Sequence, residues 1–250
     1  FTSSTLIPRS PNHFAIKLVF LSTVLPDNIS LPIIRMADVN SLLKIIMKFK
    51  NKLIPSKFQK RYKRFFTDVE SKGKTLISHC ANSGSMLGLL DEGNKTWISP
   101  ADNPDRKLKY TLEIINDKKS NVGVNTHLAN RIVEEAIEKK IIKEIKNYSE
   151  HQREVKFGLH SRLDFQLRNK TKKAFLEVKN VTLSRQNGVA EFPDAVTSRG
   201  LKHLEELEKA IKKGYESFLI YLVQREDCKE FKIAKDIDPK YYEGFLKAKK

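Results

Sequence analysis

Two short stretches in the second half of the chain alternate between hydrophobic and polar residues with a period of two. They are SRLDF at residues 161–165 and FLEVK at residues 175–179. Such alternation predicts two half-buried β-strands, with Leu163 and Phe165 on the core face of the first. The segment between them, residues 168–173, is short and polar and predicts a hairpin loop.

The register of this hairpin decides which polar side chains face each other. If the turn is centred in the middle of the loop, Asp164 lies directly opposite Glu177. The same register puts Arg162 opposite Lys179. Directly opposed residues have Cβ atoms about 4.5–5.5 Å apart. Two facing carboxylates repel each other in a purely structural sheet, whereas a divalent cation held between them makes the pair favourable.

Asp164, Glu177 and Lys179 together form the pattern D…ExK, the signature of metal-dependent phosphodiesterases called PD-(D/E)xK. Carboxylates are hard oxygen ligands suited to Mg²⁺, or to Mn²⁺ in its place. The lysine could orient a water or stabilise developing negative charge. Glu154, on the preceding strand, could supply a further carboxylate. The alternative is an ordinary amphipathic hairpin with solvated charges, because short D…ExK strings arise by chance in a lysine-rich sequence.

The pattern before this hairpin predicts a separate domain at residues 47–122. Its signals are short strands separated by clusters of Gly, Asn, Asp and Pro, which is typical of a small barrel or closed sheet. An OB-like β-barrel is the natural candidate. The expected strands are residues 65–70, 75–80, 96–99, 108–115 and 121–124.

Residues 123–250 predict a second domain of mixed α/β type. A helix capped by Asn125 or Thr126 is followed by strands at 153–157 and in the two alternating stretches. A second helical region runs from Pro193 to Lys213, with an inward-facing stripe, and a buried strand follows. The stripe consists of Leu201, Leu204, Leu207 and Ile211, and the strand of residues 217–223. The order α-β-β-β-α-β is the core order of the PD-(D/E)xK nuclease fold.

The first 46 residues show no clear period and are poor in acidic residues. Residues 14–25 are apolar but interrupted by Lys17, so a signal or transit segment is one interpretation. The other is sequence translated from upstream of the true start, because Met47 opens a run that resembles a natural N-terminus. We favour the second and leave residues 1–46 out of the predicted fold, as a non-family extension that is either disordered or translated from upstream.

The charge balance points to a polyanionic partner. The net charge is +17, with 40% hydrophobic and 31% charged residues, as in a soluble globular protein. The positive electrostatic field of a protein with this charge attracts nucleic acid first and an anionic membrane surface second. Cys80 and Cys228 lie far apart, which disfavours a disulfide framework and a zinc site and suits a reducing cytoplasm. No apolar run approaches the length of about 20 residues needed to span a bilayer.

A basic and aromatic stretch, KFQKRYKRFF at residues 57–66, is the first candidate for nucleic-acid contact. Phosphates favour Lys and Arg, while base faces favour Tyr and Phe. The alternative is a strand with one solvated basic face. The candidate contact residues in this stretch are Lys60, Arg61, Tyr62, Lys63 and Arg64.

Seven strings closely resemble the sugar fermentation stimulation protein A (SfsA) family, over about residues 47–243. They are RFFTDVE, HCANSGSMLGLL, DNPDRKLKYTLE, VGVNTHLAN, SRLDF, EVKNVTL and FPDAVTSRGLKHLEEL. The resemblance implies an OB-like domain joined to a PD-(D/E)xK domain, DNA binding with little sequence preference, and a regulatory role in maltose utilisation. Where the family usually has HCPNTG this chain has HCANSG, and a short final segment of the family is expected to be missing after Lys250.

The resemblance carries over to particular residues. Asp164, Glu177 and Lys179 fall on the family's active-site motif, and the first two would hold the metal. Arg199, Lys202 and His203 fall on its helix motif and are candidates for contact with phosphate. They share, with Glu206, the helix face away from the leucine stripe. Arg162, on the face of Asp164, is counted with the nucleic-acid-binding residues.

Two functions follow from these observations. One is a magnesium-dependent nuclease that grips DNA, single- or double-stranded, with its barrel. The other is a non-catalytic, DNA-binding regulator of sugar metabolism on a nuclease scaffold. Both place the protein in the cytoplasm, at the nucleoid if it binds DNA, and neither needs a small-molecule cofactor. Membrane association is disfavoured, because both predicted helices pack their apolar stripes against the core and leave no apolar face for a membrane.

Overall fold

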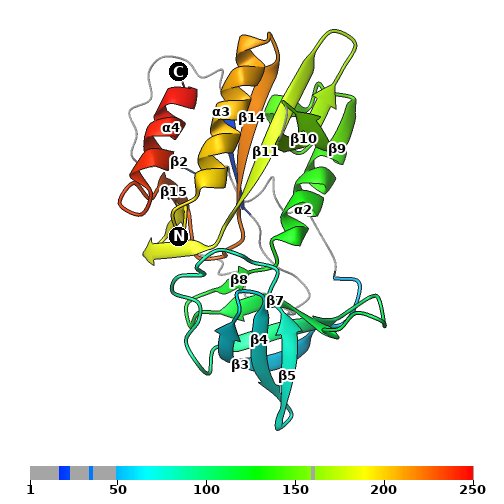
Figure 1. Cartoon of the computed structure of the whole chain (residues 1–250), viewed down its shortest axis with the longest axis vertical. Helices are drawn as coiled ribbons and strands as arrows, with labels where there is room; N and C mark the ends of the chain where they lie inside the picture. The colour runs from blue at the N-terminus through cyan, green and yellow to red at the C-terminus, as the bar shows by residue number, and fades with distance from the viewer. Residues whose placement is uncertain (1–16, 23–33, 36–48, 159–160, 250) are drawn as a thin grey trace, which may run out of the picture.

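The computed structural model describes residues 17–22, 34–35, 49–158 and 161–249. Figure 1 shows a β-barrel at one end of the molecule and an α/β domain at the other. Helix α2 (His127–Glu138) leads from the barrel into the α/β domain. The predicted division into an OB-like barrel and a C-terminal α/β domain is therefore confirmed at the level of architecture.

The barrel is a six-stranded sheet in the order β5-β4-β3-β6-β7-β8. It closes because β5 also pairs in parallel with β7, with Ser78 opposite Tyr110. The five predicted strands are present, and the first strand of the barrel overlaps the basic stretch at residues 57–66. The strands are β3 (Ile54–Tyr62), β4 (Phe66–Ser71), β5 (Lys74–His79), β6 (Lys95–Pro100), β7 (Tyr110–Asn116) and β8 (Asn121–Gly123).

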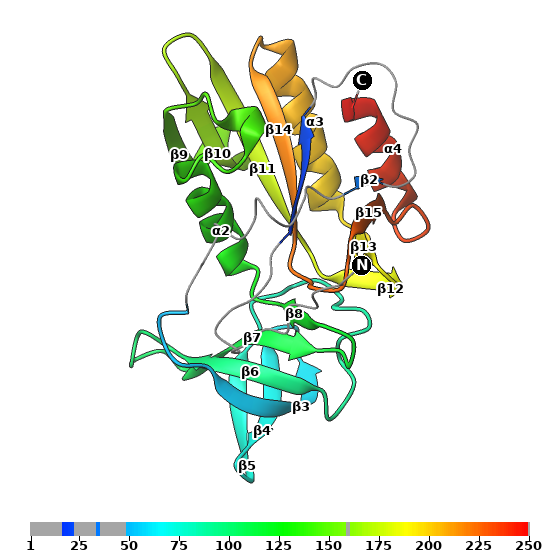
Figure 2. The same ribbon diagram turned by 180° about the vertical axis from the view of Figure 1, so that it is seen from behind.

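The α/β domain is built on a five-stranded sheet in the order β1-β14-β11-β10-β9. Helix α2 covers one face of this sheet, and α3 (Ser198–Lys212) and α4 (Pro239–Lys249) cover the other (Figure 2). The predicted order α-β-β-β-α-β is confirmed. The strands are β1 (Lys17–Ser22), β9 (Glu150–Phe157), β10 (Ser161–Arg168), β11 (Lys173–Val181) and β14 (Glu216–Val223).

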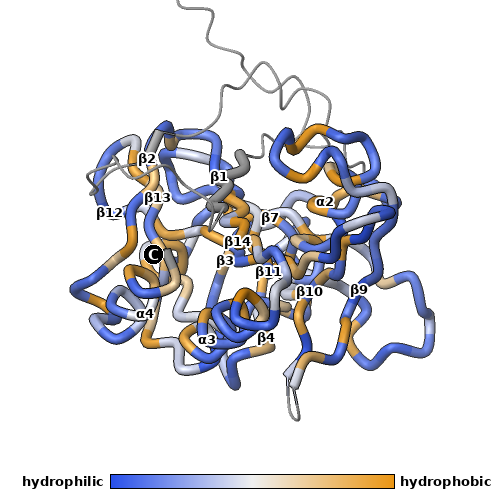
Figure 3. The backbone as a smooth tube through the Cα atoms, turned by 90° about the horizontal axis from the view of Figure 1, so that it is seen from above, coloured by the Kyte–Doolittle hydropathy of each residue, from blue (hydrophilic) through white to orange (hydrophobic). Residues whose placement is uncertain are grey.

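Strand β14 is the buried strand that its apolar sequence predicts. It pairs in parallel with β11, and its residues 217–223 are all buried. Seen from above, the strand runs through the middle of the domain, and its hydrophobic residues are coloured orange (Figure 3). The two flanking cores bury its alternate side chains, Ile220 on the side of α2 and Leu219 on the side of α3.

A second, small sheet, helix α4 and a short 3₁₀ helix were not predicted. The sheet has the order β12-β13-β15-β2 and lies beside α4 (Figure 2). Its strands are β12 (Leu183–Gln186), β13 (Val189–Phe192), β15 (Glu230–Ile233) and β2 (Ile34–Arg35), and the 3₁₀ helix η1 spans Lys143–Ile145.

Leaving residues 1–46 out of the fold was wrong for the two segments of that region that the structure describes. The backbone of β1 pairs antiparallel with β14, with Lys17 opposite Val223, and β2 pairs with β15. An apolar strand edge is exposed when β14 lacks this neighbour, which explains why a hydrophobic segment pairs there. The rest of residues 1–46, and Met47, lie outside the described residues.

Three finer predictions were wrong. Leu163 does not share a face with Phe165, because Leu163 joins the core under α3 and Phe165 the core under α2. The alternation breaks at Asp164, whose neighbour on β9, Glu154, has a left-handed backbone with φ of +52°. The second helix begins at Ser198 rather than at Pro193, and Ile211 in its predicted inward stripe is 39% exposed.

Candidate metal and nucleic-acid site

The hairpin of β10 and β11 has the predicted register. Phe165 pairs with Leu176 and Arg168 with Lys173, and one further step in the same register places Asp164 opposite Glu177. The backbone pairing of the two strands ends before that step, and a side chain takes its place: the Asp164 carboxylate accepts a hydrogen bond from the backbone N–H of Val178 at 2.7 Å. Asp164 therefore turns into the gap between the two strands.

The environment of Asp164 favours its protonated form. Its second carboxylate oxygen accepts a hydrogen bond from the side-chain amide of Asn130 on α2, at 2.8 Å. Burial, followed by the negative charge of Glu177, raises the pKa of Asp164 to about 6. The N–H groups of Val178 and Asn130 and the ammonium of Lys179 act in the opposite direction but do not compensate.

Glu177 is buried, with only 2% of its side chain exposed. Its Oε1 atom lies 2.6 Å from Lys179 Nζ and also contacts Nδ1 of His203 on α3. Burial by itself would raise the pKa of Glu177, but Lys179 and His203 lower it below its usual value. The side chain is thus held as a carboxylate, which is the form that binds metal ions.

The Oε2 atom of Glu177 is buried and has no hydrogen-bond partner among the described residues. An ionised oxygen in that state is costly unless a cation or a donor meets it. Asp164, also mostly buried, stands on the neighbouring strand. A divalent cation of the Mg²⁺ type requires hard oxygen ligands of this kind. Asp164 and Glu177 therefore fit a metal ion, with the unpartnered Oε2 atom of Glu177 as a donor.

Lys179 completes the cluster. Its side chain is 11% exposed, and its Nζ atom lies 3.0 Å from Nδ1 of His203 as well as close to Glu177. Glu177 and Lys179 are thus in contact, and Asp164 on the next strand lies near enough for the charges of both to affect its pKa. Glu154, in contrast, is exposed on β9. Among the described residues, one cluster offers three atoms close enough together for a metal, from Glu134, Glu138 and His151, but Glu134 already pairs with Arg153 at 3.1 Å.

The predicted nucleic-acid-binding residues occupy different settings. Arg61 is held by the fold, because its guanidinium donates to the backbone carbonyls of Arg64, Gly84 and Asn82 at 2.8, 2.9 and 2.7 Å.

The other candidates of this stretch are more accessible. Lys63 and Arg64 are exposed in the turn after β3, both with left-handed backbones. Lys60 lies 3.6 Å from Asp68, and its Nζ atom sits over the ring of Tyr62.

The candidates of the α/β domain divide in the same way. Arg162, Arg199 and Lys202 are exposed. His203, one turn after Arg199, is buried against Glu177, which places it in the carboxylate cluster rather than on the surface. This helix face therefore meets the carboxylate cluster at His203.

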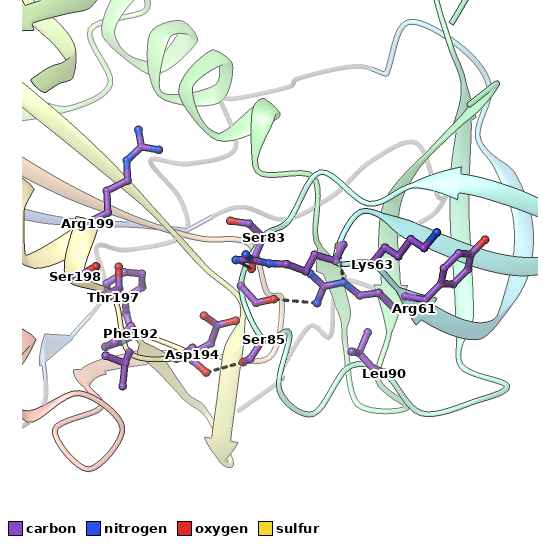
Figure 4. A pocket seen from close by; sticks show the side chains of 16 residues that line it. Arg61, Lys63, Ser83, Ser85, Leu90, Phe192, Asp194, Thr197, Ser198 and Arg199 are labelled. Atoms are coloured by element: carbon purple, nitrogen blue, oxygen red, sulfur yellow. Dashed lines mark hydrogen bonds between the residues drawn. The ribbon is translucent and has the colours of Figure 1, made fainter. Parts of the chain in front are cut away.

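A cleft of about 770 Å³ lies between the barrel and the α/β domain. Arg61, Lys63 and Arg64 line its barrel side, and Thr197 and Arg199 line the opposite side (Figure 4). The guanidinium of Arg199 is separated from the other labelled side chains in that view.

Asp194 bridges this cleft and was missed by sequence reasoning. Its backbone carbonyl accepts a hydrogen bond from Ser85 Oγ at 2.6 Å, drawn in Figure 4, and its carboxylate accepts the N–H of Met86 at 2.9 Å. The carboxylate packs so closely on Gly84 that a Cβ there would lie 2.7 and 2.9 Å from its oxygens. Both partners lie in strings that carry the family resemblance, HCANSGSMLGLL and FPDAVTSRGLKHLEEL, which was the available signal.

Comparison with known proteins agrees over most of the chain. The profile described as the SfsA N-terminal OB domain matches residues 60–124, and that described as the sugar fermentation stimulation protein RE domain matches residues 127–250. The sugar fermentation stimulation protein homolog of Pelagibacter ubique is 54% identical over 204 residues, covering 82% of this chain and 88% of that protein. The homolog of Rhodospirillum centenum is 48% identical over 79% of this chain and 86% of that protein.

A solved structure is also similar. It is that of Pyrococcus furiosus SfsA in complex with Ca²⁺, with a TM-score of 0.74 and 26% sequence identity, covering 82% of this chain and 87% of that one. With two domain profiles that together span residues 60–124 and 127–250, and close relatives of matching length, this chain belongs to the sugar fermentation stimulation protein (SfsA) family.

Proposed function

We propose that this protein is a metal-dependent phosphodiesterase that acts on nucleic acid, with its site at Asp164, Glu177 and Lys179. The observation that carries the proposal is the unpartnered Oε2 atom of Glu177, buried beside Asp164. The sheet supports it, because D…ExK stands on two adjacent strands between α2 and α3, as in the PD-(D/E)xK nuclease fold.

Asp164 and Glu177 would hold the ion. Bound there, Mg²⁺ or Mn²⁺ would supply Lewis acidity and a lowered pKa for a coordinated water. The related P. furiosus SfsA was solved in complex with Ca²⁺, a hard cation that also takes oxygen ligands. This relative supports a metal in the family and is compatible with the donor set found here.

The chain's own residues perform the remaining tasks. His203 contacts one oxygen of Glu177 and leaves the other, Oε2, as the atom that would bind an ion. Asn130 and the N–H of Val178 fix the orientation of Asp164. Lys179 places a positive charge beside the carboxylates, where it can neutralise charge that develops on a phosphoryl oxygen or orient a water.

Binding and cleavage test this proposal together. Calorimetric titration of Mn²⁺ into the metal-free protein is expected to show one site, which Glu177→Gln abolishes. Cleavage of labelled DNA in Mg²⁺ is expected to fall by at least about a hundredfold in the same variant. Glu205→Gln, an exposed carboxylate on α3, is the matched control and should change neither. Equal metal binding by wild type and Glu177→Gln would refute the metal site.

The second candidate is a nucleic-acid-binding regulator without turnover. It is favoured by the fact that both oxygens of Asp164 already accept hydrogen bonds and that Lys179 is paired with Glu177 and His203. The same experiment separates the two functions. Metal binding and DNA binding without cleavage in Mg²⁺ or Mn²⁺ would favour the regulator.

A further inference from the structure

A second hollow lies on the barrel, next to the interdomain cleft. We call it the barrel groove; its volume is about 580 Å³. Its lining combines three aromatic rings, three aliphatic side chains and three lysines, and no Asp or Glu is found among the described residues that line it. These residues are Tyr62, Phe66 and Tyr110, then Leu76, Ile77 and Leu108, and then Lys63, Lys107 and Lys109, with Thr75.

The apolar part of the groove is open to solvent. Ile77 is 45% exposed, and Tyr62, Phe66 and Tyr110 are each only half-buried. The rings of Tyr62 and Phe66 stack on each other with centroids 5.5 Å apart and an interplanar angle of 22°. Two parallel rings next to exposed aliphatic surface form a flat platform, which a partner with flat apolar faces would cover.

The charges around this platform select the kind of partner. Lys63, Lys107 and Lys109 are exposed at its rim. A ligand that offers both flat apolar rings and regularly spaced negative charges matches aromatic and cationic side chains together, and unpaired nucleotides have this chemistry. In a duplex the faces of the bases are stacked on one another and cannot reach such a platform.

The barrel groove is continuous with the path to the carboxylates. Tyr62 and Lys63 line both the groove and the interdomain cleft. The far side of the cleft ends at Arg199, and His203 follows four residues later, about 6 Å along the axis of α3. His203 contacts Glu177. A strand seated on the groove would thus be led past Arg199 toward the proposed site.

We infer that the barrel groove binds single-stranded nucleic acid, with bases on Tyr62 and Phe66 and phosphates on the lysines, and delivers that strand through the interdomain cleft. This inference rests on the proposed phosphodiesterase function and adds its substrate class, an unpaired strand. DNA and RNA strands share the chemistry that the groove recognises, so both are used in the test.

The test measures binding apart from cleavage. Fluorescence anisotropy of labelled 20-nucleotide DNA and RNA strands, and of the corresponding duplexes, is recorded in EDTA. Wild type is expected to bind the single strands more tightly than the duplexes. Tyr62→Leu, which keeps apolar volume but removes the ring, should weaken single-strand binding by about fivefold or more. Tyr62→Phe keeps the ring and is expected to retain the affinity, which separates stacking from the bond between the Tyr62 hydroxyl and Asp68.

If Tyr62→Leu does not fold, Ile77→Glu replaces it, since this exposed position tolerates a polar residue and puts a carboxylate onto the groove floor. Equal affinity for single strands and duplexes, unchanged in either variant, would overturn the inference. So would an equal loss of affinity for labelled polyglutamate, which would mark a general polyanion surface. Cleavage of duplex DNA with unchanged binding would refute only the groove, whereas weakened binding without any cleavage would refute only the phosphodiesterase.

Discussion

At the scale of single residues, Asp164 shows how the proposed metal site costs stability. In the metal-free protein its pKa is about 6, against about 3.8 in the unfolded chain, because the folded state buries it beside Glu177. The folded protein therefore holds the proton more tightly. The contribution of this group to the free energy of unfolding is therefore greatest below about pH 4 and is lost as the pH rises toward 6.

Asp164→Asn removes this titration while an amide can still accept the bond from Val178 and pair with Asn130. In EDTA at pH 7.5 we expect the variant to be more stable than wild type by about 1–2 kcal/mol, and the two to converge near pH 4. Urea unfolding at several pH values measures this difference. A difference that stays constant between pH 4 and 7.5 would show that the carboxyl carries no such cost.

Arg61 has a structural role that no local sequence pattern predicts. The sequence presents it as one cation in a basic stretch, but its guanidinium joins backbone carbonyls up to 23 residues away. We expect Arg61→Lys, which keeps the charge but loses the fork, to lower the free energy of unfolding by about 2 kcal/mol. Arg64→Lys is the matched control, because Arg64 is exposed and its contact with Ser83 is long, at 3.4 Å. Equal unfolding midpoints for both variants in urea would assign Arg61 to the surface instead.

The convergence of Asp164, Glu177 and Lys179, on the other hand, could be predicted from the sequence. The length of the short loop fixes the register, so the sequence predicted that Asp164 stands opposite Glu177. The break in alternation at Asp164, whose carboxylate accepts the N–H of Val178, could not be predicted. The burial of His203 and its contact with Glu177 could not be predicted, because they depend on where α3 packs against the sheet.

At the scale of elements, most long and strongly patterned segments were predicted, helix α4 (Pro239–Lys249) being an exception, and short ones were missed. Strands β12, β13 and β15 have four residues each, too few to establish a period against a polar background. The start of α3 was predicted too early because residues 193–197 contain no obvious breaker after Pro193. They are held outside the helix by Thr197, which caps it through the N–H of Gly200, and by Asp194, which contacts the barrel.

The contact of Asp194 with the loop at residues 82–86 allows a test at this scale. Gly84→Ala places a methyl group against the Asp194 carboxylate and should displace it from Met86 N–H. We expect a loss of about 1–3 kcal/mol in the free energy of unfolding. In an Asp194→Ala background the clash with the carboxylate is absent and Asn82 Oδ1, 3.0 Å from the new Cβ, is the remaining close atom, so the same change should cost less by about 1 kcal/mol. Additive losses in this double-mutant cycle would show that the two residues do not interact.

At the scale of the whole molecule, the two domains share buried polar contacts as well as a cleft. Arg225, 1% exposed, follows β14 and donates to Asp117 of the barrel at 2.8 Å, and Gly123 N–H donates to the carbonyl of Gln224 at 3.0 Å. Burying a guanidinium costs several kcal/mol unless its donors are satisfied, and Asp227 and the carbonyl of Thr182 complete its bonds. These contacts hold the barrel groove and the carboxylate cluster in one arrangement.

The net charge of +17 gives the overall sign of the electrostatic field, whereas the structure shows where cations meet the proposed strand. Five exposed cations follow the groove and the cleft, namely Lys63, Arg64, Lys107, Lys109 and Arg199. Each phosphate neutralised on a single strand contributes about −0.7 to the slope of log K against log salt. We therefore expect a slope of about −3.5 for wild type.

The double variant Lys107→Gln/Lys109→Gln should reduce the magnitude of that slope by about 1.4, because two phosphate contacts disappear while the aromatic platform remains. Lys143→Gln/Lys146→Gln removes the same charge elsewhere, at two exposed lysines at the start and just after the end of η1 in the α/β domain. If only net charge mattered, both double variants would change the slope alike. If the groove positions the strand, only the first will, and anisotropy titrations between 50 and 200 mM salt decide between these outcomes.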